Sequence, residues 1–396
     1  MKKYFIVLPI VFMFIYFNGC RLFVKPPAEP VLQQLSVSEI NYNTWSDDLY
    51  YEGLEQAVEQ SLTYYSRLPS SHSFQYDNLI YSRDEMVSSL NLFLDIIKNP
   101  EKGSIARQIG EKFLFFESKN AEGNTLFTGY YEPVLDGRIV PEDDYPEPLY
   151  GIPSDLVEVD LSLFSDKWKN EKIVGRVQGN KIVPYDSREE IVYMESLNDR
   201  AKPIVYVDGI ELFFLQIQGS GLVRLEDGSL IRVNYAQKNG HPYRSIGAFL
   251  SDRVSPDTMS LQSIKTYLYN HPDEVREILS HNQSYVFFRV VDEGPLGNIE
   301  VPLTAGRSIA MDNLIVPKGG LAYIETELPI FENGAIQRWK PVKRFVLVQD
   351  TGGAIRNHGR VDIYIGSGDS AGMVAGSIKN RGRSFIIVAR KDFLTN

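Results

Sequence analysis

The chain has 396 residues, which is long enough for two domains with separate hydrophobic cores. Hydrophobic residues make up 43% of the sequence and charged residues 23%, a composition that excludes a wholly disordered chain. The formal net charge of −10 argues against a general nucleic-acid binder, and the 23 tyrosines and 21 phenylalanines fit either strand-rich structure or stacking on sugar rings.

The N-terminal segment has the pattern of an export signal. Two lysines precede an apolar run over residues 4–17, which is too short to span a bilayer comfortably. Cys20, the only cysteine, follows a small residue and resembles the acylated cysteine of bacterial lipoproteins; an uncleaved anchor with an inert thiol is the alternative. Either form places the folded part outside the cytoplasmic membrane. We expect a lipoprotein signal peptide at 1–20 and a tether at 21–45.

Helical periodicity dominates the part of the chain before Ser118. Apolar residues recur there at three- and four-residue intervals, and Asp47 and Asp48 are suited to capping the first helix. Helical texture returns in a later segment in which Pro272 is suited to a first turn. We predict helices over residues 46–68, 83–97, 105–116 and 255–281.

Strand texture follows, and it is clearest over residues 205–235. Apolar runs there are separated by Asp208-Gly209 and Asp227-Gly228, pairs that tolerate positive φ and are typical of hairpin turns. The pattern therefore predicts a β-meander. Further strands are predicted over residues 285–289, 321–326, 344–349, 360–365 and 384–389.

One strand of the predicted meander carries side chains suited to sugars. Alternation places Phe214, Gln216 and Gln218 on one face of it. Amide side chains beside an aromatic ring suit N-acetyl sugars, through hydrogen bonds and stacking. A core strand with a satisfied polar edge explains the same pattern equally well.

Three aspartates, Asp350, Asp362 and Asp369, lie close together near the C-terminus. A carboxylate held against apolar side chains loses hydration, so its pKa rises and it can carry a proton near neutral pH. In the strand 361–365, alternation places Asp362 and Tyr364 on the face opposite the apolar residues, outside a closed barrel. Asp362 is thus positioned as a proton donor, whereas the glycine-rich turns beside the other two aspartates fit structural roles equally well.

Other catalytic classes find little support. The five histidines show no metal-ligand spacing and there is no cysteine pair, so no metal is expected. Gly366-Ser367-Gly368 could suggest a dinucleotide loop, but fewer than 30 residues follow, too few for the βαβ unit of such a cofactor site. No serine or cysteine nucleophile lies in an elbow motif. Asp350-Thr351-Gly352 resembles the active-site turn of aspartic proteases, but those enzymes need two such aspartates and this chain has one Asp-Thr-Gly.

A series of motifs runs through residues 127–390, most of the folded chain. The motifs lie at residues 127–134, 148–150, 213–221, 239–247, 301–308, 349–355, 360–368, 371–372 and 375–376. In this order they resemble the motifs of the membrane-bound lytic murein transglycosylase A family, including its C-terminal three-aspartate domain.

The resemblance implies a mainly β fold with peripheral helices: a double-psi β-barrel domain interrupted by a smaller inserted β domain. We expect the barrel domain, with the N-terminal helices, at 46–137 and 283–396, and the insert at 138–282. The groove between them would bind a peptidoglycan glycan strand. The basic C-terminal region, with nine Lys or Arg against four Asp from Pro341 onward, is a plausible partner for acidic peptide stems or an ordinary solvated surface.

The resemblance also implies the chemistry. Asp362 matches the family's single catalytic aspartate, and Asp350 and Asp369 match positions that support it. The enzyme would cleave the β-1,4 bond after N-acetylmuramic acid without water and leave 1,6-anhydromuramic acid ends. Substrate-binding candidates within or beside the motifs are Tyr130, Tyr131, Glu132, Gln216, Gln218, Ser220 and Tyr364.

Arg21, which follows the cysteine, favours the periplasmic side of a Gram-negative outer membrane for a lipid-anchored monomer. A peptidoglycan hydrolase on the same scaffold, a non-catalytic cell-wall binding lipoprotein and an aspartic protease-like enzyme are the alternative functions.

Overall fold

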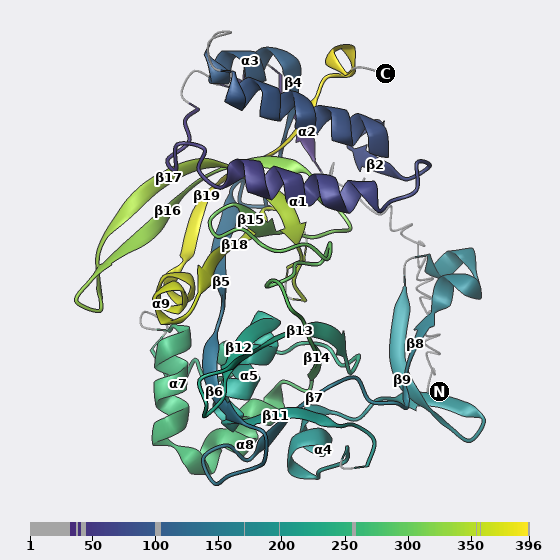
Figure 1. Cartoon of the computed structure of the whole chain (residues 1–396), viewed down its shortest axis with the longest axis vertical. Helices are drawn as coiled ribbons and strands as arrows, with labels where there is room; N and C mark the ends of the chain where they lie inside the picture. Colours follow the sequence, from purple (N-terminus) through teal and green to yellow (C-terminus); the bar gives the residue numbers. More distant parts are fainter. Residues whose placement is uncertain are drawn as a thin grey trace, which may run out of the picture.

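Two large β-sheets divide the molecule into an upper and a lower part (Figure 1). The computed structural model describes residues 32–36, 39–40, 45–99, 104–169, 171–197, 199–255, 259–353, 355–356 and 358–394. The predicted signal peptide and Cys20 lie outside these residues. Within them, no helix is both long and apolar enough to cross a bilayer.

The upper part is a closed barrel of six strands. Their order is β19-β16-β17-β15-β18-β5, and pairing of β19 with β5 closes the ring. Long apolar stretches of these strands have no exposed surface, so the barrel interior is a packed hydrophobic core. The expected fold class, a mainly β barrel with an inserted β domain, is confirmed. The barrel strands are β5 (Thr125–Glu132), β15 (Ser308–Ala310), β16 (Leu321–Glu332), β17 (Ala335–Asp350), β18 (Arg360–Ser367) and β19 (Lys379–Ala389).

Three helices and a small hairpin cover the top of the barrel (Figure 1). The helix α2 (Arg83–Lys98) begins with a capping box, in which Ser82 and Glu85 satisfy each other's backbone N–H groups. It matches the predicted helix 83–97. The other elements here are α1 (Leu54–Ser66), α3 (Ile105–Lys112), β2 (Ser73–Tyr76), β3 (Leu79–Ser82) and the C-terminal 3₁₀ turn η6 (Lys391–Phe393).

Two predicted helices are shorter than expected. The first was expected over 46–68 but starts at Leu54, because Asp47 Oδ1 accepts hydrogen bonds from the N–H groups of Leu49 and Tyr51 and holds this segment in a turn. The third, expected over 105–116, ends at Lys112. The apolar residues that follow form β4 (Phe113–Glu117), which pairs with β19.

Part of the expected tether is packed against the barrel domain. The strand β1 (Gln33–Gln34) pairs with β4, and Leu32 and Leu35 on either side of it are buried. Trp45 stacks on Tyr323 with 4.3 Å between ring centroids. The tether prediction for 21–45 is therefore wrong for its described residues, because their apolar side chains complete the core.

The lower part is the insert, built on a sheet of order β14-β13-β12-β6-β11-β7. This sheet runs from residue 134 to residue 290, so its own strands extend beyond the expected borders of 138 and 282. Its strands are β6 (Val134–Arg138), β7 (Glu147–Tyr150), β11 (Pro203–Val207), β12 (Ser220–Arg224), β13 (Leu230–Lys238) and β14 (Val286–Val290).

The insert also carries helices and a separate three-stranded sheet. The pair α7 and α8 confirms the helical texture predicted within 255–281, with Pro272 in the first turn of α8. The helices are α4 (Arg188–Tyr193), α5 (Gly209–Gln218), α6 (Ile246–Phe249), α7 (Leu261–Asn270) and α8 (Pro272–His281); the small sheet has β8 (Leu156–Asp160), β9 (Lys172–Gln178) and β10 (Lys181–Pro184).

The predicted meander over 205–235 is half right. Asp227-Gly228 does turn the chain between β12 and β13, but Asp208-Gly209 begins the helix α5 instead of a hairpin. The Asp208 carboxylate accepts a hydrogen bond from the N–H of Glu211, and Gly219 ends the helix with φ 82°. An apolar run ten residues long is buried as readily in a helix as in a strand.

Candidate functional site

The strand β18 positions Asp362 on the outer side of the barrel. Val361 and Ile363 have no exposed surface, whereas the side chain of Asp362 is 18% exposed. This agrees with the predicted alternation as far as Ile363, but Tyr364, which was expected on the outward face with Asp362, is buried, and Ile365 is partly exposed. The strand pairs in parallel with β5, and the register places Asp362 beside Thr128 and Tyr364 beside Tyr130. The site therefore lies on two neighbouring strands that are far apart in the sequence.

Two side chains contact the Asp362 carboxylate. The hydroxyl of Thr128 donates a hydrogen bond to Oδ1, and Arg360 Nε lies 3.5 Å from the same oxygen. Burial raises the pKa of Asp362, while the charge of Arg360 and the hydrogen bond from Thr128 oppose that rise. A carboxyl with a raised pKa and some solvent access can give up a proton and take it back.

Asp350, at the end of β17, is held by the backbone. Its Oδ1 accepts hydrogen bonds from the N–H groups of Thr351, at 2.8 Å, and Asn298, at 2.9 Å. Burial raises the pKa of Asp350 to about 6, against the lowering effect of these donors; the charge of Asp362 adds to the rise. The two aspartates therefore interact electrostatically. The Asp350 carboxylate, however, already accepts hydrogen bonds from two backbone segments.

Two tyrosines line the same region. The rings of Tyr130 and Tyr364 lie 5.4 Å apart, as the pairing of their strands dictates. Burial and the charge of Asp350 raise the pKa of Tyr130, so its phenol stays protonated. Its hydroxyl is buried without a well-formed hydrogen bond to the described residues. Tyr364 Oη lies 3.3 Å from the hydroxyl of Ser367.

Glu132 joins the barrel to the insert. Its side chain has no exposed surface and accepts hydrogen bonds of 2.6 Å from Arg232 Nη1 in β13 and from Ser367 Oγ in β18. Burial raises the pKa of Glu132, against the hydrogen bond from Ser367 and the charge of Arg232. A carboxylate enclosed in this way holds the domain junction together and offers no free face to a sugar.

The other predicted substrate residues lie in the walls of the junction. The backbone N–H of Tyr131 donates to Gln218 Oε1 at 3.1 Å, which ties β5 to the end of α5. Gln216 is buried and its Nε2 donates to the carbonyl of Val286 at 3.3 Å; Ser220 is buried in β12. The predicted shared face of Phe214, Gln216 and Gln218 is wrong, because side chains two residues apart on a helix point in different directions.

Asp369 differs from the other two aspartates in its surroundings. It is exposed in the first turn of α9 (Asp369–Ser377), a helix of small residues that packs on β5. A side chain at Gly129 would come within 2.7 Å of Ala375 Cα, and one at Gly372 within 2.8 Å of the Tyr131 ring. The glycine and alanine pairs of the motif therefore allow close packing of α9, and Asp350 and Asp362 are the two aspartates brought together.

Several residues of the site escaped prediction. Thr128, Arg360, Ser367, Asn298 and Arg232 all contact a predicted site residue. Most of them lie inside or beside the family motifs listed above, and this position is the only indication in the sequence that they belong to the site. Their roles depend on pairings between distant strands.

Among the described residues, no group of three or more His, Cys, Asp or Glu could hold a metal ion.

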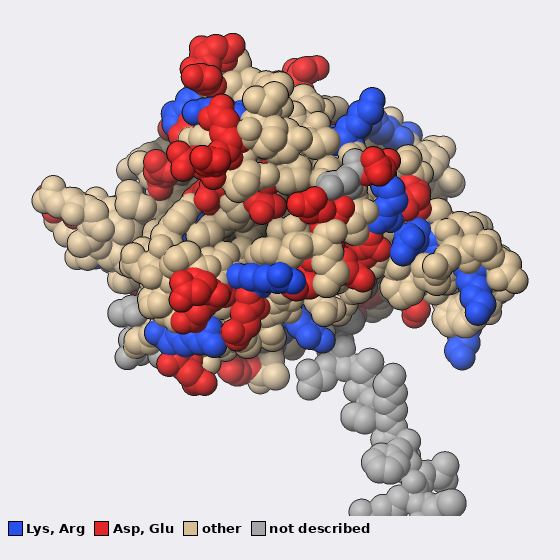
Figure 2. Space-filling view, turned by 90° about the horizontal axis from the view of Figure 1, so that it is seen from below, with Lys and Arg blue, Asp and Glu red and all other residues tan. Residues whose placement is uncertain are grey.

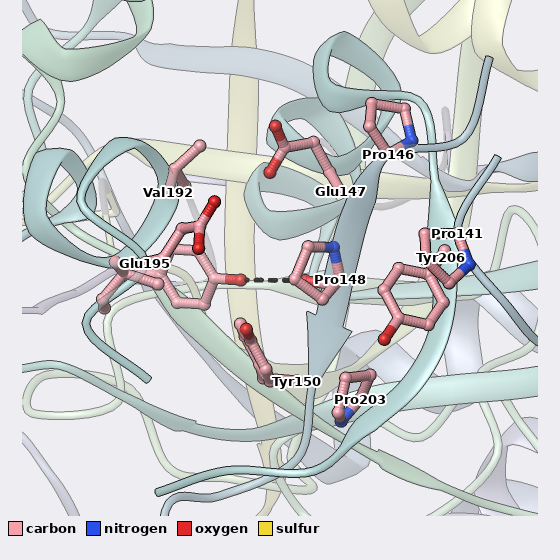
Figure 3. A pocket seen from close by; sticks show the side chains of 11 residues that line it. Pro141, Pro146, Glu147, Pro148, Tyr150, Val192, Glu195, Pro203 and Tyr206 are labelled. Atoms are coloured by element: carbon pink, nitrogen blue, oxygen red, sulfur yellow. Dashed lines mark hydrogen bonds between the residues drawn. The ribbon is translucent and has the colours of Figure 1, made fainter. Parts of the chain in front are cut away.

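A separate hollow of about 390 Å³ lies in the insert, away from these residues (Figure 3). Glu147 and Glu195 extend toward the same side of it (Figure 3). Burial, with the charges of Asp208 and Glu195, raises the pKa of Glu147 to about 7. The remaining wall is made of proline, tyrosine and aliphatic side chains: Pro141, Pro146, Pro148, Tyr150, Ile191, Val192, Pro203, Tyr206 and Tyr285.

Comparison with known proteins identifies the family. Residues 126–289 match the family model described as the MltA specific insert domain, and residues 307–388 match the 3D domain. The chain is 32% identical to membrane-bound lytic murein transglycosylase A of Escherichia coli K12, over 71% of this chain and 70% of that protein. The chain belongs to the membrane-bound lytic murein transglycosylase A family. As a member of this family it is a lytic murein transglycosylase, as its motifs predict.

Other members of the family support the same assignment. The protein of that name from Vibrio cholerae is 35% identical over 66% of this chain and 65% of its own length. The structure of the membrane-bound lytic murein transglycosylase from Agrobacterium tumefaciens is 30% identical and superimposes with a TM-score of 0.72, covering 91% of this chain and 98% of that one. The E. coli MltA structure with bound chitohexaose is 26% identical, with a TM-score of 0.68 over 90% of this chain and 94% of its own.

Proposed function

We propose that Asp362 is the single catalytic acid and base of this lytic murein transglycosylase. The observation that carries the proposal is the environment of its carboxyl group: burial raises the pKa, Thr128 orients one oxygen, and part of the side chain remains open to solvent. Asp350 is engaged by two backbone N–H groups and Asp369 is exposed, so neither has this combination.

The reaction needs one carboxyl group acting twice. Protonated Asp362 gives its proton to the glycosidic oxygen between N-acetylmuramic acid and N-acetylglucosamine as the bond to C1 breaks. The resulting carboxylate then takes the proton of the C6 hydroxyl, and O6 bonds to C1. The product is a 1,6-anhydromuramic acid end, no water is consumed, and Asp362 is protonated again. Glycosidases that use two carboxyl groups place the second one as base or nucleophile.

The substrate is a peptidoglycan glycan strand bound between barrel and insert. Tyr130, which is partly exposed beside Asp362, is suited to stacking on a sugar ring, whereas Tyr364 is 3% exposed and packs against the Tyr130 ring. Arg232 of the insert donates a hydrogen bond to Glu132 on β5, the strand that also carries Thr128 and Tyr130, so the insert lies beside this side of the barrel. The chitohexaose bound to E. coli MltA, a glycan ligand, supports this class of substrate.

The cellular setting follows from the N-terminal sequence. Acylated Cys20 anchors the monomeric enzyme at the periplasmic side of the outer membrane. The names of the E. coli and V. cholerae relatives, which call them membrane-bound, support an anchored form. The reaction uses acid–base chemistry of the protein's own side chains and requires no cofactor.

Digestion of purified sacculi by the wild type and by Asp362→Asn tests the proposal. We expect the wild type to release fragments with anhydro ends, and the variant to lose about 100- to 10,000-fold in rate while remaining folded. Asp369→Asn is the matched control, because this exposed residue should tolerate the same change. Retained cleavage in Asp362→Asn would refute the role of Asp362.

Product masses separate the alternative functions. A reducing end carries one more water than an anhydro end, so it would identify a hydrolase on the same scaffold. Binding to sacculi without release of soluble fragments would indicate a cell-wall binding protein. Peptide cleavage that pepstatin inhibits would indicate the protease.

A further inference from the structure

One part of the insert stands apart from both large sheets. This lobe comprises β8, β9 and β10 together with two 3₁₀ turns, η4 (Leu161–Leu163) and η5 (Asp166–Trp168). Figure 1 shows β8 and β9 projecting along the right side of the molecule. The lobe contains none of the residues that surround Asp362, so the proposed catalysis does not account for its exposed apolar side chains.

One face of the lobe's sheet is apolar and uncovered. Ile182 pairs with Val177, and Ile173 lies four residues before Val177 on β9, so the three side chains are on the same face of the sheet. Their exposed fractions are 45% for Ile173, 61% for Val177 and 49% for Ile182. The opposite face meets the body of the insert, where Glu158 accepts a hydrogen bond from Gln237.

The end of the lobe presents larger apolar side chains. Leu163 is 83% exposed, Phe164 is 70% exposed and Trp168 is 39% exposed. Backbone hydrogen bonds hold this segment in shape, from the N–H of Phe164 to the carbonyl of Leu161 and from the N–H of Trp168 to the carbonyl of Ser165. The segment is thus an ordered structure that holds its apolar side chains outward, against the usual preference for burial.

Exposed lysines lie near this apolar surface, together with the exposed acids Asp166 and Glu171. Lys167, Lys169 and Lys181 are exposed, and no ion pair joins them to the described residues. Figure 2 shows blue side chains at the outer end of the lobe, on the right of the view. Residues 156–184, which hold the lobe, carry five Lys or Arg against four Asp or Glu, so the lobe is locally less acidic than a chain whose net charge is −10.

We propose that the lobe docks on the surface of a phospholipid bilayer. Leu163, Phe164 and the apolar sheet face enter the boundary between headgroups and acyl chains, and the lysine ammonium groups contact lipid phosphates. Trp168, only part of whose surface is exposed, suits the boundary itself, where tryptophan is enriched.

The position of the N-terminal anchor favours this occupant. The inference rests here on the proposed acylation of Cys20, which precedes Leu32 by 12 residues in the sequence. Such a segment spans at most about 40 Å, so the folded part stays close to the membrane. Leu32 lines a hollow with His72 and Phe74, and Figure 1 shows β2, to which Phe74 belongs, on the same side as the lobe. The tether thereby raises the effective concentration of the lobe at the bilayer.

Fluorescence quenching by vesicles tests the docking directly. The full-length protein is mixed with phosphatidylethanolamine–phosphatidylglycerol vesicles that carry brominated acyl chains, which quench tryptophan only on close approach. We expect a quenched component in the wild type that Trp168→Phe abolishes, because Trp45 and Trp339 lie outside the lobe. In a Cys20→Ser background, Leu163→Ser combined with Phe164→Ser should lower vesicle partitioning at least about tenfold.

Controls separate docking from folding and from catalysis. Ile336→Ser removes an apolar side chain that is 40% exposed on β17, outside the lobe, and should leave quenching unchanged. All lobe variants should digest purified, lipid-free sacculi in detergent as the wild type does, so failure of docking and failure of the proposed chemistry give different results. A vesicle-bound wild type with unquenched Trp168 would overturn the proposal, as would a homodimer in solution that Leu163→Ser with Phe164→Ser dissociates.

Discussion

The hydroxyl of Thr128 donates a hydrogen bond to Oδ1 of Asp362, although the two residues are 234 positions apart in the sequence. The parallel pairing of β5 with β18 produces this contact, because its register sets the two residues side by side. The bond fixes one oxygen of the carboxyl group and lowers its pKa, against the rise that burial causes. Thr128 is therefore a positioning residue for the proposed acid.

Thr128→Val should shift the pH dependence of catalysis. The pKa of Asp362 rises when this donor is lost, so the acid stays protonated to higher pH. The alkaline limb of the pH–activity profile therefore shifts to higher pH. Loss of orientation should also lower kcat/KM by about 10- to 100-fold. The measurement is the rate of fragment release from sacculi as a function of pH. Thr128→Ser keeps the hydroxyl and should leave the limb in place; an unmoved limb in Thr128→Val would contradict the coupling.

Asp350 should tolerate an amide better than Asp362 does. Asparagine keeps an oxygen that can accept from the N–H groups of Asn298 and Thr351, so we expect Asp350→Asn to retain activity within about tenfold. Asp350→Ala leaves both donors without their acceptor and should cost on the order of 1 to 3 kcal/mol in the free energy of unfolding. Sacculus digestion and urea unfolding measure the two effects. If Asp350→Asn were as inactive as Asp362→Asn, the acid would have to be reassigned.

Asp47→Asn should destabilise the fold strongly. Asp47 and Arg307 form a buried bidentate ion pair with contacts of 2.6 and 2.8 Å, and Arg307 has no exposed surface. Burial alone would raise the pKa of Asp47, but Arg307 lowers it below its usual range. Removing the carboxylate leaves a buried charge unpaired, at a cost of about 3 to 5 kcal/mol in urea unfolding. Asp136→Asn, in an exposed pair with Arg224, is the matched control and should change stability by less than about 1 kcal/mol.

Glu147→Gln should stabilise the protein at alkaline pH. The pKa of Glu147 is about 7 in the folded protein and near 4.5 when unfolded, so the folded state binds more protons between these values and stability falls as the pH rises through that window. The variant lacks this loss and should gain on the order of 1 to 2 kcal/mol over the wild type at pH 8, with little difference at pH 4. Urea unfolding at the two pH values measures it, and an equal gain at pH 4 and at pH 8 would contradict the raised pKa of Glu147.

Local patterns predicted the elements whose signals are complete within a few residues. The apolar spacing over residues 83–97 predicted α2, and Pro272 begins α8 as expected. Alternation correctly separated Asp362 from Val361 and Ile363, because opposite faces of a strand at a barrel wall meet different environments.

The failures share a physical cause. The run after Asp208 forms the helix α5. An apolar run is compatible with either a strand or a helix, and here burial against the insert sheet and the caps at both ends favour the helix. Glu132 lies in a family motif beside the site, yet its contacts with Arg232 and Ser367 make it part of the junction.

The sequence by itself determined the family, the β-rich architecture and the segment that carries three aspartates. Only the tertiary structure decided what distinguishes these aspartates. Asp362 meets Thr128, Asp350 meets the backbone of Asn298, and Asp369 meets solvent. The reason is that the pKa and orientation of a carboxyl group depend on its burial and on donors that strand pairing brings from distant parts of the chain, and neither quantity is written in the local sequence.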